Sequence, residues 1–525
     1  MAMKYDAIVI GGGHNGLVAA AYLAKAGKKV LVLEKRYLVG GASVTEELHP
    51  GFKFTVFSYV VSLLRPDIVR ELELARHGLT ILPLESTLTP LPDGRYLYRG
   101  ADHWETLRNI ARFSERDAGA YDEYSRNMYF MAKAVKYILG IRPPDPTSYH
   151  PRELWGLVEM ARHFLNLPEE QLWLLAKLMT MSAADFVEQW FESEPLKATL
   201  SASGIIGTFL GPRSPGTAYV LLHHYMGEID GAFRAWGVAR GGTGGIAEAI
   251  ARSAQASGAE IRCDSPVAAV IVKDGRAAGV ALENGDTFAA DIVVSSLDPR
   301  LTFLKMVDPG QLPGELVESI RSFNTRGSSG KVNLALDALP ELAALPGPGR
   351  HLAGAISFSP SVDYLERAYD DAKYGDFSRQ PYVDVIIPSV IDPGMAPPGK
   401  HVMSCFVQYA PYILREGTWE EKREAFGDAV IDALSTVMPN LKDIILHRQV
   451  LTPLDIEEMI GISQGNIFHG ELSLSQLFFL RPAPGYADYR TPIRGYYQCG
   501  SGTHPGGGIM GAPGKLAALE ILKDS

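Results

Sequence analysis

The residues best suited to chemistry in this sequence are glycines, and they stand in two segments near the ends of the chain. In the first segment Gly11, Gly13 and Gly16 have the Gly-x-Gly-x-x-Gly spacing. With this spacing the first glycine permits a tight turn, the second lets the backbone approach a pyrophosphate, and the third allows a helix to pack closely on a strand. The segment therefore predicts a phosphate-binding turn.

The elements around this turn must form a βαβ unit to position it. Apolar and alanine-rich stretches predict a strand at residues 5–10, a helix at 17–26 and a second strand at 28–33. Glu34 ends the second strand, where a carboxylate can accept hydrogen bonds from both ribose hydroxyls. The free N–H groups at the start of the helix would face the phosphates. We therefore predict a dinucleotide-binding site.

The residues after Glu34 favour FAD over NAD. Lys35 and Arg36 follow directly, and Gly40-Gly41-Ala42-Ser43 comes shortly after. This run resembles the flavoprotein extension of the fingerprint, in which a second glycine pair lets the chain pass close to the pyrophosphate. The alternative is an ordinary surface turn at Gly40-Gly41.

The second glycine-rich segment lies near the C-terminus. Residues 496–499 resemble a short strand, residues 500–514 are rich in glycine, and a helix is predicted at 515–522. So many glycines before a helix indicate that the backbone closely approaches a flat or anionic group.

The two terminal motifs together resemble the phytoene-desaturase-like branch of the FAD-dependent amine-oxidase superfamily, which also contains retinol saturase. The decisive C-terminal motif is Gly-x-Gly-Thr-His-Pro-Gly-Gly-Gly at residues 500–508. Residues 214–219, 465–471 and 480–482 are similar to the pyridine nucleotide-disulfide oxidoreductase domain-containing protein 2 subgroup. The resemblance implies an α/β fold with a discontinuous Rossmann-like FAD-binding domain and an α+β substrate domain with a helical subdomain.

The resemblance also implies which residues hold FAD. They are Gly11, Gly13, Asn15 and Gly16 at the pyrophosphate, Glu34 at the adenosine ribose, Lys35, Arg36, Gly41, Ala42 and Ser43 at neighbouring groups, Val267 at the adenine through its backbone, Gly500, Ser501 and Gly502 at the ribityl and phosphate region, and Gly508, Ile509 and Met510 at the pyrimidine edge of the flavin. Ser501 departs from the pattern of many flavoproteins, which carry an acidic residue there.

The middle of the chain contains a second, imperfect fingerprint. Gly242-x-Gly244-x-x-Ala247 has the glycine spacing, but residues 236–240 make a poor strand and no acidic residue follows at the proper distance. We interpret it as structural. Without a second nucleotide domain, oxygen or a quinone is the expected electron acceptor rather than NADH.

The remaining patterns predict five segments in two domains. The FAD-binding domain comprises residues 1–104, 231–310 and 481–525. Its second segment contains antiparallel strands near 268–272, 277–282 and 291–295. The substrate domain comprises a helical part, 105–230, and a sheet part, 311–480, with strands near 331–336, 382–388 and 401–408. The apolar stretches 128–141 and 154–181 predict either a helical core or a surface that lines a lipid tunnel or touches a membrane.

Composition excludes several classes of protein. The chain has 525 residues and a formal net charge of −10, without a basic stripe, so nucleic acid is not an expected partner. Cys263, Cys405 and Cys499 are far apart, which excludes dithiol chemistry. Because no apolar run is long enough to span a membrane and a strand begins by Tyr5, we expect a cytoplasmic protein, with peripheral contact at the inner face of a membrane as the alternative.

His504 is the best catalytic side-chain candidate, because its motif would wrap the flavin and an imidazole can move a proton. The alternative is a histidine that braces the glycine-rich loop. His223, His224 and His469 could also face a cavity, but no metal-ligand spacing joins them, and no metal is expected. Flavin chemistry requires few protein acids or bases, so the absence of a catalytic triad is no objection.

These features predict an FAD-dependent oxidoreductase. By resemblance, it removes or adds hydrogen at a carbon–carbon bond of a small hydrophobic substrate of isoprenoid or carotenoid-like type. The alternatives are an amine or alcohol oxidase of the same fold and a flavin-binding regulatory or interaction protein, because one fold supports many functions.

Overall fold

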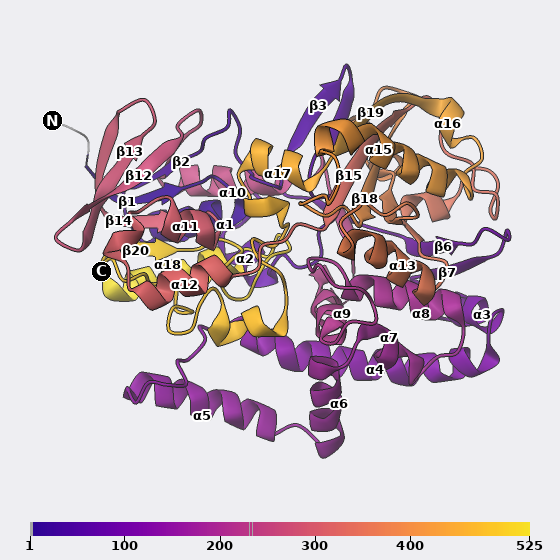
Figure 1. Cartoon of the computed structure of the whole chain (residues 1–525), viewed down its shortest axis with the longest axis horizontal. Helices are drawn as coiled ribbons and strands as arrows, with labels where there is room; N and C mark the ends of the chain where they lie inside the picture. The colour runs from indigo at the N-terminus through magenta and orange to yellow at the C-terminus, as the bar shows by residue number, and fades with distance from the viewer. Residues whose placement is uncertain (1–3, 230, 234) are drawn as a thin grey trace.

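The structure, a computed structural model, describes residues 4–229, 231–233 and 235–525. It contains two seven-stranded sheets (Figure 1). The first sheet lies at the left of Figure 1 with both chain termini, the second lies at the upper right, and a group of helices lies below the second sheet. The predicted mixed α/β architecture is confirmed.

Five parallel strands form the centre of the first sheet. In spatial order they are β11 (Glu260–Arg262), β2 (Val30–Leu33), β1 (Lys4–Ile10), β14 (Thr287–Ser295) and β20 (Tyr496–Gln498). Three helices pack together over one face, namely α1 (His14–Lys25), α10 (Gly244–Ala256) and α18 (Ala512–Asp524). Both faces of the strands are buried, as parallel sheets require, since Ala7 and Val9 pack under these helices whereas Ile8 and Ile10 belong to a separate core.

The predicted antiparallel strands extend this sheet. Strands β12 (Val267–Lys273) and β13 (Arg276–Leu282) form a hairpin, and β13 pairs with the first residues of β14. The last residues of β14 pair in parallel with β20. The antiparallel strands are therefore continuous with the parallel ones.

The second sheet is built from strands that are far apart in the sequence. Its spatial order is β19 (Ile445–Leu451), β15 (Ser329–Leu336), β18 (His401–Gln408), β17 (Tyr382–Ile386), β16 (Ala355–Phe358), β6 (Ser86–Pro90) and β7 (Tyr96–Gly100). Alternate residues such as Val332 and Leu334 pack against α15 (Trp419–Ser435). Lys331, on the same strand, points to the opposite face of the sheet, because successive side chains in a strand point to its two faces in turn.

Two predicted segment boundaries are wrong. Strands β6 and β7 lie before residue 104, but they belong to the second sheet because β6 pairs with β16. Helix α12 (Gly314–Ser322) lies after residue 310, but its Leu316 and Ile320 pack into the core of the first sheet. The other segment boundaries stay predictions.

Residues 105–230 are mostly helical, as predicted. The helices in this part of the chain are α3 (His103–Ala111), α4 (Glu115–Ile138), α5 (Pro151–Leu165), α6 (Glu169–Thr180), α7 (Ala183–Glu188), α8 (Glu194–Ser201) and α9 (Thr217–Tyr225). Helix α5 lies at the lower edge of Figure 1, apart from the main body, and contains no buried residue. The apolar stretch 154–181 falls in two helices, α5 and α6, which are separated around Pro168.

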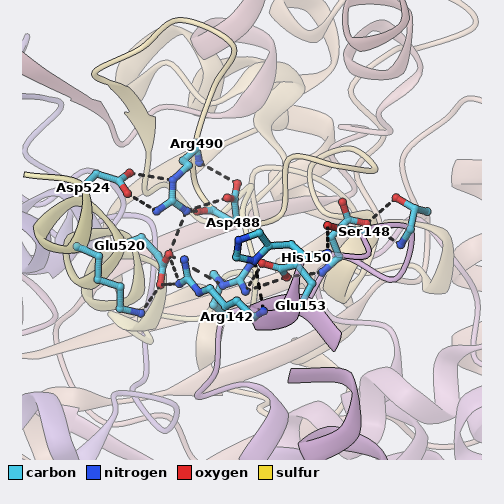
Figure 2. A network of polar contacts seen from close by, with 12 residues as sticks. Arg142, Ser148, His150, Glu153, Asp488, Arg490, Glu520 and Asp524 are labelled. Carbon is cyan, nitrogen blue, oxygen red and sulfur yellow. Dashed lines mark hydrogen bonds and ion pairs between the residues drawn. The ribbon is translucent and has the colours of Figure 1, made fainter. Parts of the chain in front are cut away.

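An ionic network attaches the start of α5 to α18 (Figure 2). The Glu520 carboxylate, 2% exposed, accepts hydrogen bonds from Arg152 at 2.6 Å and from Arg490 at 3.0 Å. Arg142 binds Glu153 at 2.7 Å, which holds the connection between α4 and α5. Burial raises the pKa of Glu520, but hydrogen bonds from Lys523, Arg152 and Arg490 lower it to about 2.

The second glycine fingerprint is structural, as interpreted. The segment before it does form a short strand, β10 (Gly237–Ala239), which we did not expect, but β10 pairs in an antiparallel manner with β5 (Ile81–Pro83). A side chain at Gly242 or Gly244 would collide with Thr45. The glycines therefore allow the start of α10 to pack against Thr45.

Shorter elements complete the chain. The remaining strands are β3 (Thr45–His49), β4 (Phe52–Thr55), β8 (Glu228–Ile229) and β9 (Ala232–Phe233). The remaining helices are α2 (Pro66–Glu71), α11 (Pro299–Leu304), α13 (Val362–Lys373), α14 (Pro388–Ile391), α16 (Leu441–Ile444) and α17 (Pro453–Ile460). Across the described ranges, no helix combines the length and apolar character needed to cross a bilayer.

Candidate active site

A cavity lies where β1, β2 and β14 end. Gly11, Glu34 and Ser296, which line it, each follow the carboxyl end of one of these strands. Ligands of parallel α/β sheets bind at this edge. The predicted site residues that line the cavity are Gly11, Gly13, Asn15, Glu34, Arg36, Gly41, Ala42, Ser501, Gly508 and Ile509.

The glycine turn presents the N-terminus of α1 to the cavity. A side chain at Gly16 would collide with the carbonyl oxygen of Gly11, so only glycine fits there. A side chain at Gly13 would meet no atom within 4 Å, which means that the space above its backbone is open. Gly13 is the N-cap residue and gives α1 no side-chain cap, so N–H groups of the first turn are free for an anion.

The Glu34 carboxylate is held in place by two backbone N–H groups. Its Oε2 accepts a hydrogen bond from the Gly12 N–H at 2.7 Å, and its Oε1 accepts one from the Arg36 N–H at 2.9 Å. Each carboxylate oxygen keeps a further acceptor position. The side chain of Arg36 binds Glu46 at 2.9 Å, so part of its charge is already balanced.

The C-terminal glycine-rich segment forms the opposite wall. Asn15 Nδ2 donates a hydrogen bond to Ser501 Oγ at 3.0 Å, which joins the two terminal motifs. Arg481, which is fully buried, donates to the carbonyl oxygens of Ser501 at 2.9 Å, Phe468 at 2.8 Å and Gly470 at 3.1 Å. Arg481 therefore braces the loop from behind.

Several predicted FAD-binding residues do not line the cavity. A side chain at Gly500 would collide with Leu297, and one at Gly502 with Pro299, so both are packing positions. The Ser43 hydroxyl donates to the Thr243 carbonyl at 2.7 Å, and Met510 packs into the helical core. Gly16, Lys35 and Val267 are likewise absent from the lining. Contact of these residues with the cofactor stays a prediction.

His504 lies away from the cavity lining. Its Nε2 makes a hydrogen bond with the Ile138 carbonyl oxygen at 2.9 Å, and burial lowers the pKa of its imidazole to about 3. Its backbone carbonyl accepts a hydrogen bond from the Tyr489 hydroxyl at 3.0 Å. These contacts favour the bracing role that we gave as the alternative. Of the other histidines, His224 and His469 line the cavity and His223 does not.

The lining also contains polar residues that were not predicted from the sequence, among them His14, Tyr59 and Lys331. His14 occupies an unspecified position of the glycine fingerprint, and Tyr59 lies in a loop, so neither carries a signal. Lys331 was detectable, because a lysine that begins an apolar strand is unusual. Its ammonium donates to the Thr55 carbonyl at 2.6 Å, and burial lowers its pKa to about 7.

A second cavity adjoins the first and is called the side chamber here. Both are lined by Tyr59, Val60, Ile206, His224 and Trp236. In this shared wall Tyr59 stacks on Phe406, with ring centroids 5.5 Å apart, and His224 stacks on Trp236 at 6.1 Å. The junction is therefore largely aromatic and apolar.

Tyr59 links this junction to an acid. Its hydroxyl donates to Asp384 Oδ2 at 2.7 Å, and burial raises the pKa of Asp384 to about 6. Asp384 lines the side chamber, and it makes no ion pair with a lysine or arginine in the described part of the chain.

Buried polar atoms around the first cavity fit a bound dinucleotide. Asn15 Oδ1, His14 Nε2 and His469 Nδ1 are buried and have no hydrogen-bond partner among the described residues, although all three residues line the cavity. Burial lowers the pKa of His14 to about 3 and that of His469 to about 4, so both rings are neutral and can donate or accept. These residues fit the phosphate and hydroxyl groups of FAD.

Comparisons with known proteins agree with this geometry. Residues 161–521 match the flavin containing amine oxidoreductase family, and residues 9–72 match the NAD(P)-binding Rossmann-like domain. Pyridine nucleotide-disulfide oxidoreductase domain-containing protein 2 of Rattus norvegicus is 41% identical, over 99% of this chain and 94% of that protein.

Two more distant relatives are named as enzymes. A limonene dehydrogenase polypeptide of Castellaniella defragrans is 26% identical, over 99% of this chain and 94% of its own. Prolycopene isomerase 1, chloroplastic, of an Oncidium hybrid cultivar is also 26% identical, over 100% and 84%. Among solved structures, wild-type putrescine oxidase bound to putrescine has the same fold, with a TM-score of 0.59, 16% identity and 99% of each chain covered. The chain therefore belongs to the flavin-containing amine oxidoreductase family and is an FAD-dependent oxidoreductase.

Proposed function

We propose that the protein is a dehydrogenase that introduces a double bond between two carbon atoms of a hydrophobic substrate, of isoprenoid or carotenoid-like type. The observation that carries this proposal is the side chamber, which meets the FAD cavity at an aromatic and apolar junction. Aromatic and apolar residues such as those of this junction are typical of the walls that contact hydrophobic ligands, whereas polar residues such as Arg99 and Ser125 also line the chamber. The names of limonene dehydrogenase and prolycopene isomerase, two relatives over nearly the full chain, agree with such a substrate.

In this proposal, residues of both terminal motifs hold FAD. The N–H groups at the start of α1 bind the pyrophosphate, and Glu34 binds the adenosine ribose. Asn15 and Ser501, on opposite walls of the cavity, hold the part of FAD that lies between them. Gly508 and Ile509, just before α18, lie at the flavin ring. Each of these residues lines the cavity.

The proposed reaction breaks two C–H bonds and forms one carbon–carbon double bond. FAD, when bound, supplies the oxidant and takes up one hydrogen as hydride. The other hydrogen leaves as a proton, which Asp384 is placed to accept. Because the pKa of Asp384 is raised only to about 6, its carboxylate is mostly ionised at neutral pH. Tyr59 fixes Oδ2 of Asp384 and leaves Oδ1 for the proton.

The electron acceptor in this proposal is oxygen or a quinone. The second glycine fingerprint packs against Thr45. The strand before it, β10, pairs antiparallel with β5, whereas a nicotinamide-binding fingerprint follows a strand of a parallel sheet. A small or apolar acceptor could enter through the same side chamber.

We further propose that α5 rests on a membrane surface, which is the source of the hydrophobic substrate. Leu154, Trp155, Val158 and Leu165 recur on one side of this projecting helix and are all exposed, with Trp155 61% exposed. Such a stripe suits burial at a lipid interface. Cosedimentation with phospholipid vesicles should decrease strongly in Trp155→Ser, and concentration-dependent dimerisation without vesicle binding would contradict the proposal.

Amine oxidation is the second candidate. Asp384 is a chamber-lining carboxylate without a described lysine or arginine partner, and such a group could hold a substrate ammonium. The likeness to putrescine oxidase supports only the shared fold. Bleaching of the flavin by putrescine in the absence of oxygen would favour this candidate.

Product analysis tests the proposed dehydrogenation. Incubation of the FAD-loaded protein with an apolar lipid extract in air should produce, by mass spectrometry, a compound that has lost two hydrogen atoms from its precursor. Gly13→Val, which fills the space above the glycine turn, is the matched control and should produce none. A product of unchanged mass would indicate isomerisation and would contradict the proposal.

A further inference from the structure

The chamber face of the second sheet carries charged groups at two separated positions. Asp384 on β17 pairs in register with Ser357 on β16, Ala355 on β16 pairs with Thr87 on β6, and Thr87 pairs with Arg99 on β7. Residues opposite each other share a face, as do residues two apart on one strand. All five residues line the side chamber.

The register gives the separation of the two charged groups. Arg99 is three strands away from Asp384 and is displaced by two residues along the strands. With about 4.8 Å between strands and about 3.3 Å per residue, their α-carbons are roughly 16 Å apart. Asp384 contacts Tyr59 at the junction with the FAD cavity. Arg99 lines the side chamber and does not line the FAD cavity.

Arg99 is a cation whose hydrogen-bonding capacity is used only in part among the described residues. It forms no ion pair with any carboxylate in the described ranges, and its side chain donates a hydrogen bond to the Thr199 hydroxyl at 3.2 Å. Its Nε is buried without a partner among those residues. An arginine side chain only donates hydrogen bonds, so a group that satisfies it must be an acceptor.

A hydroxyl group that also lines the chamber has an unused hydrogen-bonding capacity. Ser125 Oγ, on α4, is buried and lacks a partner in the described structure. Buried donors without acceptors are costly, which indicates that a ligand supplies the acceptors.

Other charged groups of the lining do not balance Arg99. Glu85 is exposed to solvent, and His103 pairs with Asp122 at 3.1 Å. Arg99 is therefore the cation available to a ligand that enters the side chamber.

We infer that the substrate is an amphipathic acid. Its carboxylate binds Arg99, and its apolar chain extends toward Tyr59, so that the bond that reacts lies in the part of the chain remote from the acid group. This inference rests on the proposed function and specifies the substrate class of the same site. A bidentate carboxylate on a partly buried guanidinium is a strong, directional contact.

Matched probes test the inference. Farnesoic acid and farnesol share one isoprenoid chain and differ in the acid or alcohol group at its end. Their dissociation constants for the FAD-loaded protein are measured from the perturbation of the flavin absorbance. We expect the acid to bind at least tenfold more tightly than the alcohol, as a charge-assisted hydrogen bond in a buried site predicts.

Variants locate the preference. Arg99→Met should remove the preference for the acid and leave farnesol binding unchanged, whereas Arg99→Lys should keep part of it. Arg76→Met, which removes an exposed arginine paired with Glu73, is the matched control and should behave like the wild type. FAD content and Tm are measured for each variant, and Ser125→Ala, with a smaller loss of preference, provides an independent result if Arg99→Met is unstable.

Each outcome is decisive. Equal affinity of the wild type for both probes, or a preference that persists in Arg99→Met, would overturn the acid anchor and leave the proposed function standing. Binding of neither probe would overturn the proposed function together with this inference.

Discussion

Asn15 and Ser501 are joined by a hydrogen bond of 3.0 Å between Nδ2 and Oγ, although 486 positions separate them in the chain. Asn15 lies in the first turn of α1 and Ser501 in the C-terminal glycine-rich loop, and both line the cavity assigned to FAD. Asn15 Oδ1 is left without a partner among the described residues. The contact closes the FAD cavity by holding its two walls together.

Removal of this contact should weaken cofactor binding. In Ser501→Ala, the loss of one buried hydrogen bond should raise the Kd for FAD roughly threefold to tenfold. The Kd is measured by titrating the apoprotein with FAD and following the quenching of flavin fluorescence. Ser322→Ala, at an exposed helical serine, is the control. An unchanged Kd in Ser501→Ala would show that the contact does not support the cofactor.

Glu34 should determine the affinity for the adenosine ribose. Glu34→Gln keeps the shape of the side chain but replaces one acceptor oxygen with a donor, so we expect FAD to bind about tenfold or more weakly. The free energy of unfolding of the apoprotein should change less, since one of the backbone N–H groups keeps an acceptor. Normal FAD retention after gel filtration would count against the ribose assignment.

The buried ammonium of Lys331 makes stability depend on pH. Its pKa is about 7 in the folded chain and about 10.4 in an unfolded one, so the unfolded chain binds more protons between these values. Stability from this group therefore rises with pH from about 7 to about 10 and is constant below 7. Denaturant unfolding of the apoprotein at pH 7 and pH 9 measures the rise.

Lys331→Met should lose this part of the pH dependence, because methionine does not titrate. Lys442→Met, which removes an exposed lysine paired with Asp432, should retain it. An equal rise with pH in Lys331→Met and the wild type would assign the effect to other groups.

His504 should contribute to stability rather than to rate. His504→Ala removes the bond to the Ile138 carbonyl and leaves a small cavity, so Tm should fall by several degrees. Flavin reduction by substrate, followed by stopped-flow absorbance, should keep its rate within about twofold, as expected for a side chain outside the lining. A large drop in that rate with FAD still bound would restore the catalytic role.

Glu520 should anchor α5 to the body of the protein (Figure 2). Glu520→Gln leaves several cations without their shared carboxylate, and we expect a loss of about 3 kcal/mol in the free energy of unfolding. Because the pKa of Glu520 is lowered to about 2, its contribution is complete above about pH 4.5 and is lost as the pH falls toward 2. Glu318→Gln, at an exposed ion pair, is the control and should have little effect.

The sequence allowed prediction of the parts of the site that depend on local backbone geometry. Gly11, Gly13 and Glu34 line the cavity because a fixed glycine spacing and a strand end place them there. The strand at 401–408 was also predictable, since a short, mostly apolar run of this length is typical of a buried strand.

Long-range pairing could not be predicted in the same way. Strands β6 and β7 precede residue 104, yet hydrogen bonds to β16 place them in the second sheet. Tyr59 and Asp384 are 325 positions apart and carry no common pattern, so their contact at the junction is visible only in the structure. The acid anchor at Arg99 likewise depends on the register of four strands.

Anaerobic titration of the FAD-loaded protein tests the central claim most directly. The flavin absorbance is followed while an apolar lipid extract, NADH or putrescine is added separately in the absence of oxygen. We predict that the lipid extract bleaches the flavin bands and that equal amounts of NADH and putrescine do not. Rapid bleaching by NADH or by putrescine, with no response to the lipid extract, would contradict the proposed dehydrogenation.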